Sequence, residues 1–176
     1  MVCRHCVTTV RKALTEAGFD VRDVELGRAV VACDASQLPR IDGILRANDF
    51  ERITDPDAAL VDDIKHAVID HVRNSNECRL NLSACLADHL SVSYDHASRV
   101  FSRLEGRTIE KYQILQKVEY VKELLDERTL SLAEIADRAG YSSTAHLSRQ
   151  FKEVTSMTPT QYLACGHTQR RSIDKV

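Results

Sequence analysis

The spacing of apolar residues predicts two parts with different secondary structure. Residues 1–53 contain short apolar segments that alternate between helical and strand-like spacing, with a glycine or a proline near the boundaries. The expected elements are a helix at 6–17, strands at 21–26 and 29–33, a helix at 38–47 and a short last strand at 50–53. From Ala58 onward the spacing is helical throughout, so the expected fold class is α+β.

The C-terminal part is predicted to be entirely helical. Apolar residues recur at intervals of four over 59–72, and a long helix is expected over 109–125. Ser131 and Glu134 have the spacing of a capping box, and Thr158 followed by proline is typical of a helix start. The sequence therefore predicts a domain at 1–54, a short linker, a domain at 58–165 and a tail at 166–176.

An internal repeat runs through this helical part. Six residues recur with a spacing of 50: His96, Ser98, Arg99, Phe101, Thr108 and Tyr112 return as His146, Ser148, Arg149, Phe151, Thr158 and Tyr162. Upstream, the Ala-Asp pair at Ala87 returns at Ala136 with a spacing of 49. The pattern predicts two copies of a helix-turn-helix unit, with small alanines where the helices approach and one extra residue in the second turn.

The second helix of each unit, expected at 93–102 and 144–153, carries candidate DNA-contacting residues on its early, exposed positions. These are Asp95, Ser98 and Arg99 in the first unit and Ser143, Thr144, Ala145, His146 and Arg149 in the second. Arginine can donate two hydrogen bonds to guanine, and aspartate can accept one from cytosine. A solvated polar helix face is the alternative interpretation of any single residue, whereas Phe101 and Phe151 are expected in the core.

Residues 136–152 together with 158–162 closely resemble the signature of AraC-type transcription regulators. The resemblance implies two helix-turn-helix units joined by a long linker helix at 109–125, with double-stranded DNA as the partner. It also implies that both recognition helices read successive major-groove segments, separated by about 34 Å, one turn of DNA. RNA polymerase would be a further partner of an activator.

Four positions depart from the AraC pattern. Lys117 stands where an arginine is usual, Val121 where a small alanine is usual, and Ser156 where glycine is common. In the first unit, Ala97 replaces a larger apolar residue. The first unit is thus the weaker match, and its base contacts are the less secure prediction.

The pair Cys3 and Cys6 opens the chain immediately before the first expected helix. A Cys-x-x-Cys motif at a helix start favours thiolates, which bind soft metals such as Cu(I) and Zn(II), but redox motifs have the same spacing. The motif and the following helix and strands resemble a heavy-metal-associated domain, a small ferredoxin-like module. That resemblance implies that Cys3 and Cys6 are the metal ligands. The family has a strand before the motif, so we expect either a start upstream of Met1 or a module that lacks this strand.

Composition excludes several classes of protein. The net charge of −2 is unlike that of a typical DNA-binding domain, although the positions of Lys and Arg matter more than their sum. We find no apolar run of about 18 residues, no signal peptide and no catalytic motif, so we expect a cytoplasmic protein that is not an enzyme. The leading hypothesis is a DNA-binding regulator that responds to a soft metal. A thiol redox-responsive regulator and a metal carrier are the alternatives, and the oligomeric state is left open.

Overall fold

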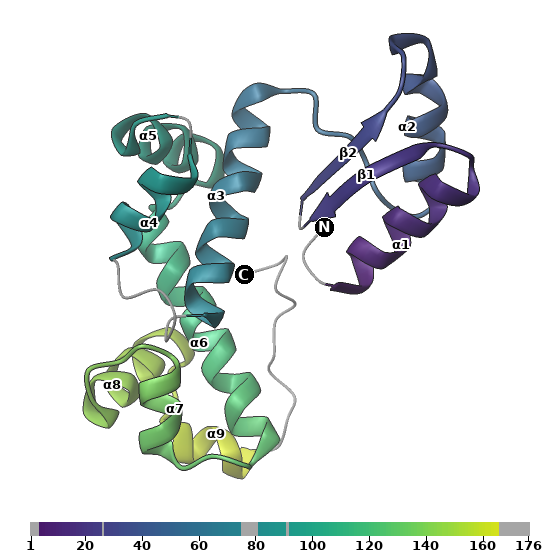
Figure 1. The fold of residues 1–176 in the computed structure, drawn as a ribbon. Helices are drawn as coiled ribbons and strands as arrows, with labels where there is room; N and C mark the ends of the chain where they lie inside the picture. Colours follow the sequence, from purple (N-terminus) through teal and green to yellow (C-terminus); the bar gives the residue numbers. More distant parts are fainter. Residues whose placement is uncertain (1–3, 26, 75–80, 91, 166–176) are drawn as a thin grey trace. The chain divides into compact units, whose positions relative to one another are not determined.

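The computed structural model describes residues 4–25, 27–74, 81–90 and 92–165, and its chain divides into two compact units (Figure 1). The first unit is Met1–His66 and the second is Ala67–Val176. The division falls within helix α3 (Pro56–Arg73), whereas the sequence indicated a boundary at residues 55–57. Pro56 begins α3. The N–H of the first helical residue has no acceptor within the helix, so a proline, which lacks that N–H, is well suited to this position.

Before α3, the first unit contains two helices and a β-hairpin in the order that the apolar pattern predicts. Its elements are α1 (Arg4–Glu16), β1 (Asp20–Glu25), β2 (Arg28–Ala32), a 3₁₀ turn η1 (Ala35–Gln37) and α2 (Leu38–Arg46). The strands are antiparallel, with a bulge between Val21 and Asp23, and Gly27 turns between them with a φ of 76°. Gly18 follows α1 with a φ of 83°, which explains why that helix ends there.

A small apolar core holds this unit together. It consists of Val10, Leu14, Phe19, Val24 and Ile41, which come from α1, β1, α2 and the turn after α1. Val10 and Leu14 are four residues apart, so they lie on the same face of α1. Each such buried side chain contributes about 1.5–3 kcal/mol of transfer free energy.

The ferredoxin-like prediction is not confirmed. Among the described residues the sheet has two strands, and residues 50–53, which we expected to form a strand, have no regular secondary structure. Asp49 has a left-handed φ of 62°, and the Phe50 N–H donates to the Leu45 carbonyl at 2.9 Å. This closure at the end of α2 fixes Phe50 against the helix, where it packs on the core instead of pairing with β2.

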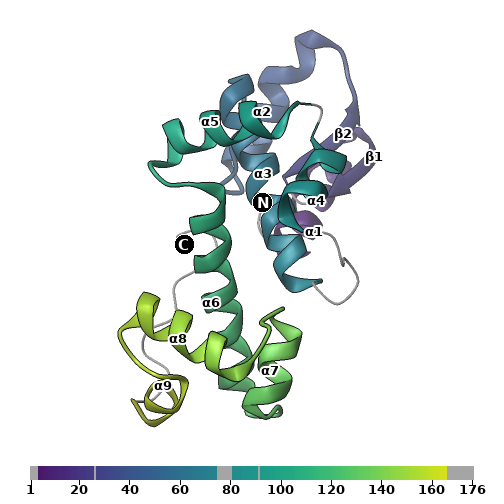
Figure 2. The same cartoon turned by 90° about the vertical axis from the view of Figure 1, so that its left-hand side faces the viewer.

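The second unit contains the two predicted helix-turn-helix pairs, which lie at opposite ends of α6 (Figures 1 and 2). Its helices after α3 are α4 (Leu82–His89), α5 (Tyr94–Glu105), α6 (Ile109–Glu127), α7 (Leu132–Arg138), α8 (Thr144–Thr155) and α9 (Pro159–Cys165). The 19 residues of α6 correspond to a length of about 28 Å at 1.5 Å per residue. None of the described helices is long and apolar enough to cross a membrane.

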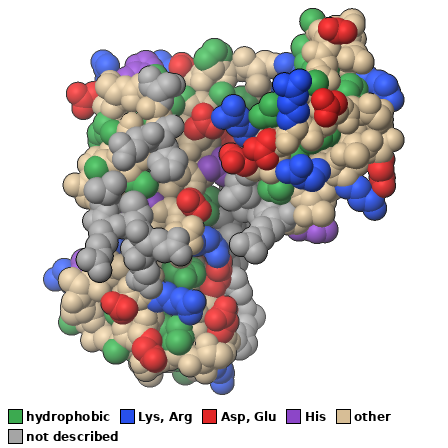
Figure 3. Space-filling model, viewed as in Figure 1, with side chains coloured by type: hydrophobic (Ala, Val, Ile, Leu, Met, Phe, Trp, Pro, Cys, Tyr) green, Lys and Arg blue, Asp and Glu red, His purple; other side chains and the backbone are tan. Residues whose placement is uncertain are grey.

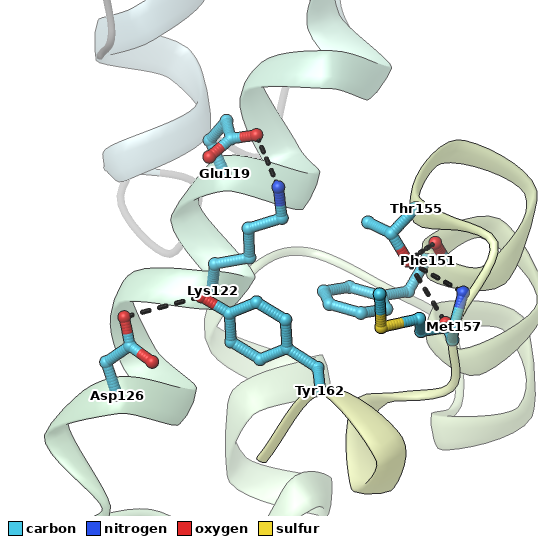
Figure 4. Close-up of polar contacts among 7 residues, drawn as sticks. All are labelled: Glu119, Lys122, Asp126, Phe151, Thr155, Met157 and Tyr162. Atoms are coloured by element: carbon cyan, nitrogen blue, oxygen red, sulfur yellow. Dashed lines mark hydrogen bonds and ion pairs between the residues drawn. The ribbon is translucent and has the colours of Figure 1, made fainter. Parts of the chain in front are cut away.

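Each end of α6 has an aromatic pair in its core, as the repeat predicts. Phe101 and Tyr112 have ring centroids 5.6 Å apart, and Phe151 and Tyr162 have centroids 5.7 Å apart. Both phenylalanines are fully buried. Figure 4 shows the second pair beside a buried ion pair on α6, in which the Lys122 ammonium donates to the Glu119 carboxylate at 2.7 Å.

Candidate nucleic-acid interface

Matching N-caps fix the start of the helices in both helix-turn-helix units. The Ser93 hydroxyl accepts from the His96 N–H at the start of α5, and the Ser143 hydroxyl accepts from the His146 N–H at the start of α8. Asn81 caps α4 and Ser131 caps α7 in the same way. In each unit the second cap follows the first by 12 residues. Because α7 is one residue shorter than α4, four residues (90–93) separate α4 from α5 and five (139–143) separate α7 from α8.

The second turn has the extra residue that the sequence predicts, but the expected equivalence of the two alanines needs a correction. The Ala-Asp pair does not occupy the same structural position in the two units. Ala136 is buried at the position that Leu86 occupies in the first unit, whereas Ala87 is exposed, as is Asp137. The predicted close approach of helices at Ala87 is therefore wrong, because the first unit fills that position with a leucine and the alanine one residue later faces outward.

The helix ends also match, but with different residues. The C-cap of α5 is Gly106 with a φ of 66°, and the C-cap of α8 is Ser156 with a φ of 64°. Their N–H groups donate to the carbonyls of Ser102 and Lys152, respectively. Ser156 thus adopts the left-handed conformation that glycine adopts without steric cost.

The candidate residues of α5 lie along its outward face. Asp95 and Arg99 are exposed, Ser98 is partly exposed, and Arg99 Nε donates to the Asp95 carbonyl at 3.2 Å. Between them, Ala97 is fully buried. Its counterpart in the second unit is Leu147, also fully buried, so the first unit has a smaller side chain at this core position.

The candidate residues of α8 surround its N-terminus. Thr144, Ala145 and Arg149 are exposed, and Ser143 is exposed while its hydroxyl caps the helix. His146 is only partly exposed. Its Nδ1 lies 3.1 Å from the Ser142 hydroxyl, and its ring meets Tyr141 edge-on with centroids 5.4 Å apart. The ring is therefore held at the turn, whereas the Arg149 side chain extends into solvent.

A supporting cluster behind this turn was not predicted from the sequence. Lys117 Nζ donates to the Gly140 carbonyl at 3.1 Å and lies 5.2 Å from the centroid of the Tyr141 ring. Burial lowers the pKa of Lys117 and raises the pKa of Tyr141, whose hydroxyl has no hydrogen-bond partner among the described residues. Lys117 drew attention only as a departure from the AraC pattern, and its spacing gave no sign that it binds the turn 23 residues later.

The described residues contain only part of the predicted metal site. Cys3 lies outside them, and Cys6 is in the first turn of α1 with a partly exposed side chain. No group of three or more His, Cys, Asp or Glu residues in the described ranges could hold a metal ion. Cys85 is buried and Cys33 is exposed.

Comparisons with known proteins agree with this architecture. Residues 86–164 match the family model described as a helix-turn-helix domain. The transcriptional regulatory protein HptR of Staphylococcus aureus is 33% identical over 99 residues, which cover 54% of this chain and 37% of that protein. The melibiose operon regulatory protein of Escherichia coli is 25% identical over 87 residues, which cover 49% of this chain and 29% of that protein. The chain thus spans about a third of the length of these relatives.

Two solved structures show the same fold. The C-terminal domain of AraT, a response regulator from Geobacillus stearothermophilus, is 24% identical with a TM-score of 0.55, over 69% of this chain and 94% of that one. The DNA-binding domain of AdpA, solved in complex with a target DNA, is 24% identical with a TM-score of 0.51, over 64% and 93%. The capped helix pairs and the family match together define residues 86–164 as a helix-turn-helix domain.

Proposed function

We propose that this protein is a sequence-specific DNA-binding transcription regulator in which α5 and α8 enter successive major-groove segments. The observation that carries the proposal is the repetition of one capped, outward-facing helix at each end of α6 (Figure 2). Arg99 and Arg149 occupy equivalent positions on these helices, and both are exposed. The relatives HptR and the melibiose regulator are regulatory proteins by name, which supports a regulator over an enzyme or a carrier.

The two helices are expected to contribute unequally to recognition. On α8, Arg149 and the residues around the helix start are exposed, and the Lys117–Gly140 hydrogen bond fixes the preceding turn. On α5, the exposed Asp95 lies beside Arg99 and reduces the positive charge that faces DNA phosphates. Acidic and basic side chains are also mixed on the face of the molecule in Figure 3, so neither unit presents a broad basic surface there.

The test is selection of bound duplexes from a random pool by the full chain, followed by anisotropy titrations at fixed salt. Arg149→Ala is expected to weaken binding to the selected sequence by about 1–3 kcal/mol while leaving non-specific binding nearly unchanged. Arg22→Ala is the matched control because it removes one exposed positive charge from β1, which lies in the compact unit Met1–His66 and outside both helix-turn-helix units. Failure to select any sequence, or equal losses for the two variants, would reject the proposal and favour the metal-carrier alternative.

We further propose that Cys3 and Cys6 make this regulator responsive to a soft metal. The support is the position of Cys6 in the first turn of α1, where the positive end of the helix dipole stabilises a bound thiolate. Two thiolates suit linear Cu(I), whereas Zn(II) normally takes four ligands, and the described residues offer no cluster that supplies the others. The cysteines would hold the ion, and the ion would bring the first turn of α1 and the residues before it together.

The response is tested by titrating operator binding with Cu(I) and, separately, with Zn(II). A change in operator affinity with Cu(I) that disappears in Cys3→Ser and Cys6→Ser variants supports metal sensing. Thiol counting after mild peroxide, with and without Cys3→Ser, tests the redox alternative, in which the two cysteines oxidise together. Identical operator affinity with and without each metal would reject metal sensing. An activator would in addition bind RNA polymerase, which transcription from the selected site in vitro would measure.

A further inference from the structure

The compact unit Met1–His66 contains a cavity of about 440 Å³ that neither the DNA-binding nor the metal proposal uses. Its walls come from α1, β2, α2, the segment at residues 50–53 and the first half of α3, all within that unit. The volume lies in the range of about 300–1,000 Å³ that is typical of ligand pockets, whereas protein interiors are otherwise close-packed. We propose that this cavity binds a small organic cation, with its apolar body inside and its ammonium group at the mouth beside Asp62 and Asp63.

The walls of the cavity are mainly apolar. The apolar lining residues are Val10, Leu14, Ala29, Val31, Leu38, Ile41, Leu45, Phe50, Ile53 and Ala59. Ile53 has 44% of its surface exposed and lines the cavity, so a bound ligand would cover apolar surface there. An apolar ligand body therefore gains free energy from burial here.

The charged groups at the mouth favour a cation. Glu51, Asp62 and Asp63 are carboxylates that line the cavity, and Arg28 and Arg52 are the guanidinium groups. Arg52 donates to both carboxylate oxygens of Asp42, at 2.9 and 3.2 Å, and Asp42 does not line the cavity, so the charge of Arg52 is already matched. Three carboxylates then face one guanidinium, and a bound ammonium would complement the excess.

Asp62 and Asp63 are also held close together at the mouth. Burial and the neighbouring Asp62 raise the pKa of Asp63, against the opposing effects of His66 and Arg28. A ligand cation beside this pair would reverse that repulsion. The half-buried Phe50 also lines the cavity, and an aromatic face attracts an organic cation.

The hairpin turn closes one side of this mouth. A Cβ atom on Gly27 would lie 2.4 Å from the His66 ring and 2.9 Å from an Asp62 oxygen, so only glycine permits this approach. His66 Nδ1 in turn lies 3.4 Å from the Asp62 carboxylate. The Asp62 side chain thus lies between the hairpin turn and the His66 ring.

The test compares three probes that share one apolar body: 4-phenylbutylamine, which is cationic at pH 7, neutral 4-phenylbutanol and anionic 4-phenylbutyrate. Binding to the full chain is measured without DNA by calorimetry and by chemical-shift changes of the residues that line the cavity. The amine is expected to bind about tenfold more tightly than the alcohol, and the acid more weakly than both. Because no DNA is present, the result does not depend on the regulator proposal.

Variants separate the charge at the mouth from the cavity itself. Asp63→Asn, at an exposed position, should remove most of the preference for the amine over the alcohol, whereas Asp20→Asn on β1 should leave it unchanged. Ala29→Trp, also at an exposed position, should fill the cavity and abolish binding of both probes. Equal binding of the three probes, shift changes outside the cavity, or an undiminished preference in Asp63→Asn would each overturn the proposal, even if Ala29→Trp does not fold.

Discussion

Replacing Ser156 by glycine should stabilise the second helix-turn-helix unit. Ser156 is the C-cap of α8 in the left-handed region, with φ 64° and ψ 7°. A non-glycine residue in that region costs about 1–2 kcal/mol of steric strain. Glycine relieves this strain, but its greater conformational freedom stabilises the unfolded chain by about 0.4–1 kcal/mol and so offsets part of the benefit. The net expected increase in the free energy of unfolding is about 0.5–1 kcal/mol.

No other interaction of Ser156 should reverse the expected stabilisation. The Ser156 backbone N–H donates to the Lys152 carbonyl at 2.8 Å, and glycine retains that hydrogen bond. The Ser156 side chain is exposed, so its removal leaves no cavity. The equivalent C-cap in the first unit is Gly106, where an added Cβ would meet no atom within 4 Å. Gly106→Ser therefore introduces the conformational cost alone and should destabilise by about the same amount.

Urea denaturation followed by circular dichroism measures both changes, and a thermal shift of about 1–4 °C should accompany Ser156→Gly. Ser156→Ala is the matched control, since alanine removes the hydroxyl but keeps the left-handed strain, and it should change stability little. A Ser156→Gly variant that is neutral or destabilised, or an alanine variant stabilised as much as the glycine one, would refute the argument from backbone strain.

Three further predictions concern side chains of the compact unit Ala67–Val176. Burial and the charge of Lys117 lower the pKa of His71 against the effect of Asp70, so the unfolded state binds this proton more readily. The free energy of unfolding should therefore fall as the pH drops below about 6.5. In His71→Gln, denaturation curves recorded across this pH range should show a smaller dependence of the free energy of unfolding on pH. Glu119→Gln should cost about 3–5 kcal/mol because it leaves the Lys122 ammonium buried without its carboxylate (Figure 4), whereas replacing both residues with apolar ones should cost much less in a double-mutant cycle. Ser143→Ala should cost about 1 kcal/mol through loss of the α8 cap, and Ser143→Thr, which retains a hydroxyl acceptor, should cost less in the same assay.

Local signals in the sequence predicted the helix starts well. Ser131 and Glu134 form the capping box that their spacing indicates, with the Ser131 N–H donating to Glu134 at 2.7 Å. Pro159 begins α9 after Thr158, whose hydroxyl accepts from the Gln161 N–H. Such caps involve residues three positions apart, so the information needed to predict them lies within one turn of helix.

The failed predictions depended on contacts that are remote in the sequence. Phe50 and Ile53 are residue types that are common in strands, but a strand also needs a neighbour, and β2 pairs with β1 alone among the described residues. Ala87 repeats the residue type of Ala136, but burial depends on which side of α4 meets its neighbours, and that side carries Leu86. The contact of Lys117 with the Gly140 carbonyl joins residues 23 positions apart on different elements, beyond any local pattern.

The two helix-turn-helix units have complementary weaknesses, and this allows a test of how α6 couples them. The first unit has the favourable Gly106 cap but the smaller core residue Ala97, whereas the second has Leu147 in the core but the strained Ser156 cap. The two caps share no hydrogen-bond partner, so the effects of Gly106→Ser and Ser156→Gly should add within about 0.3–0.5 kcal/mol. The double variant should then unfold with nearly the wild-type free energy. A larger departure from additivity would mean that α6, whose two ends pack against different helix-turn-helix units, transmits a change in one helix-turn-helix unit to the other.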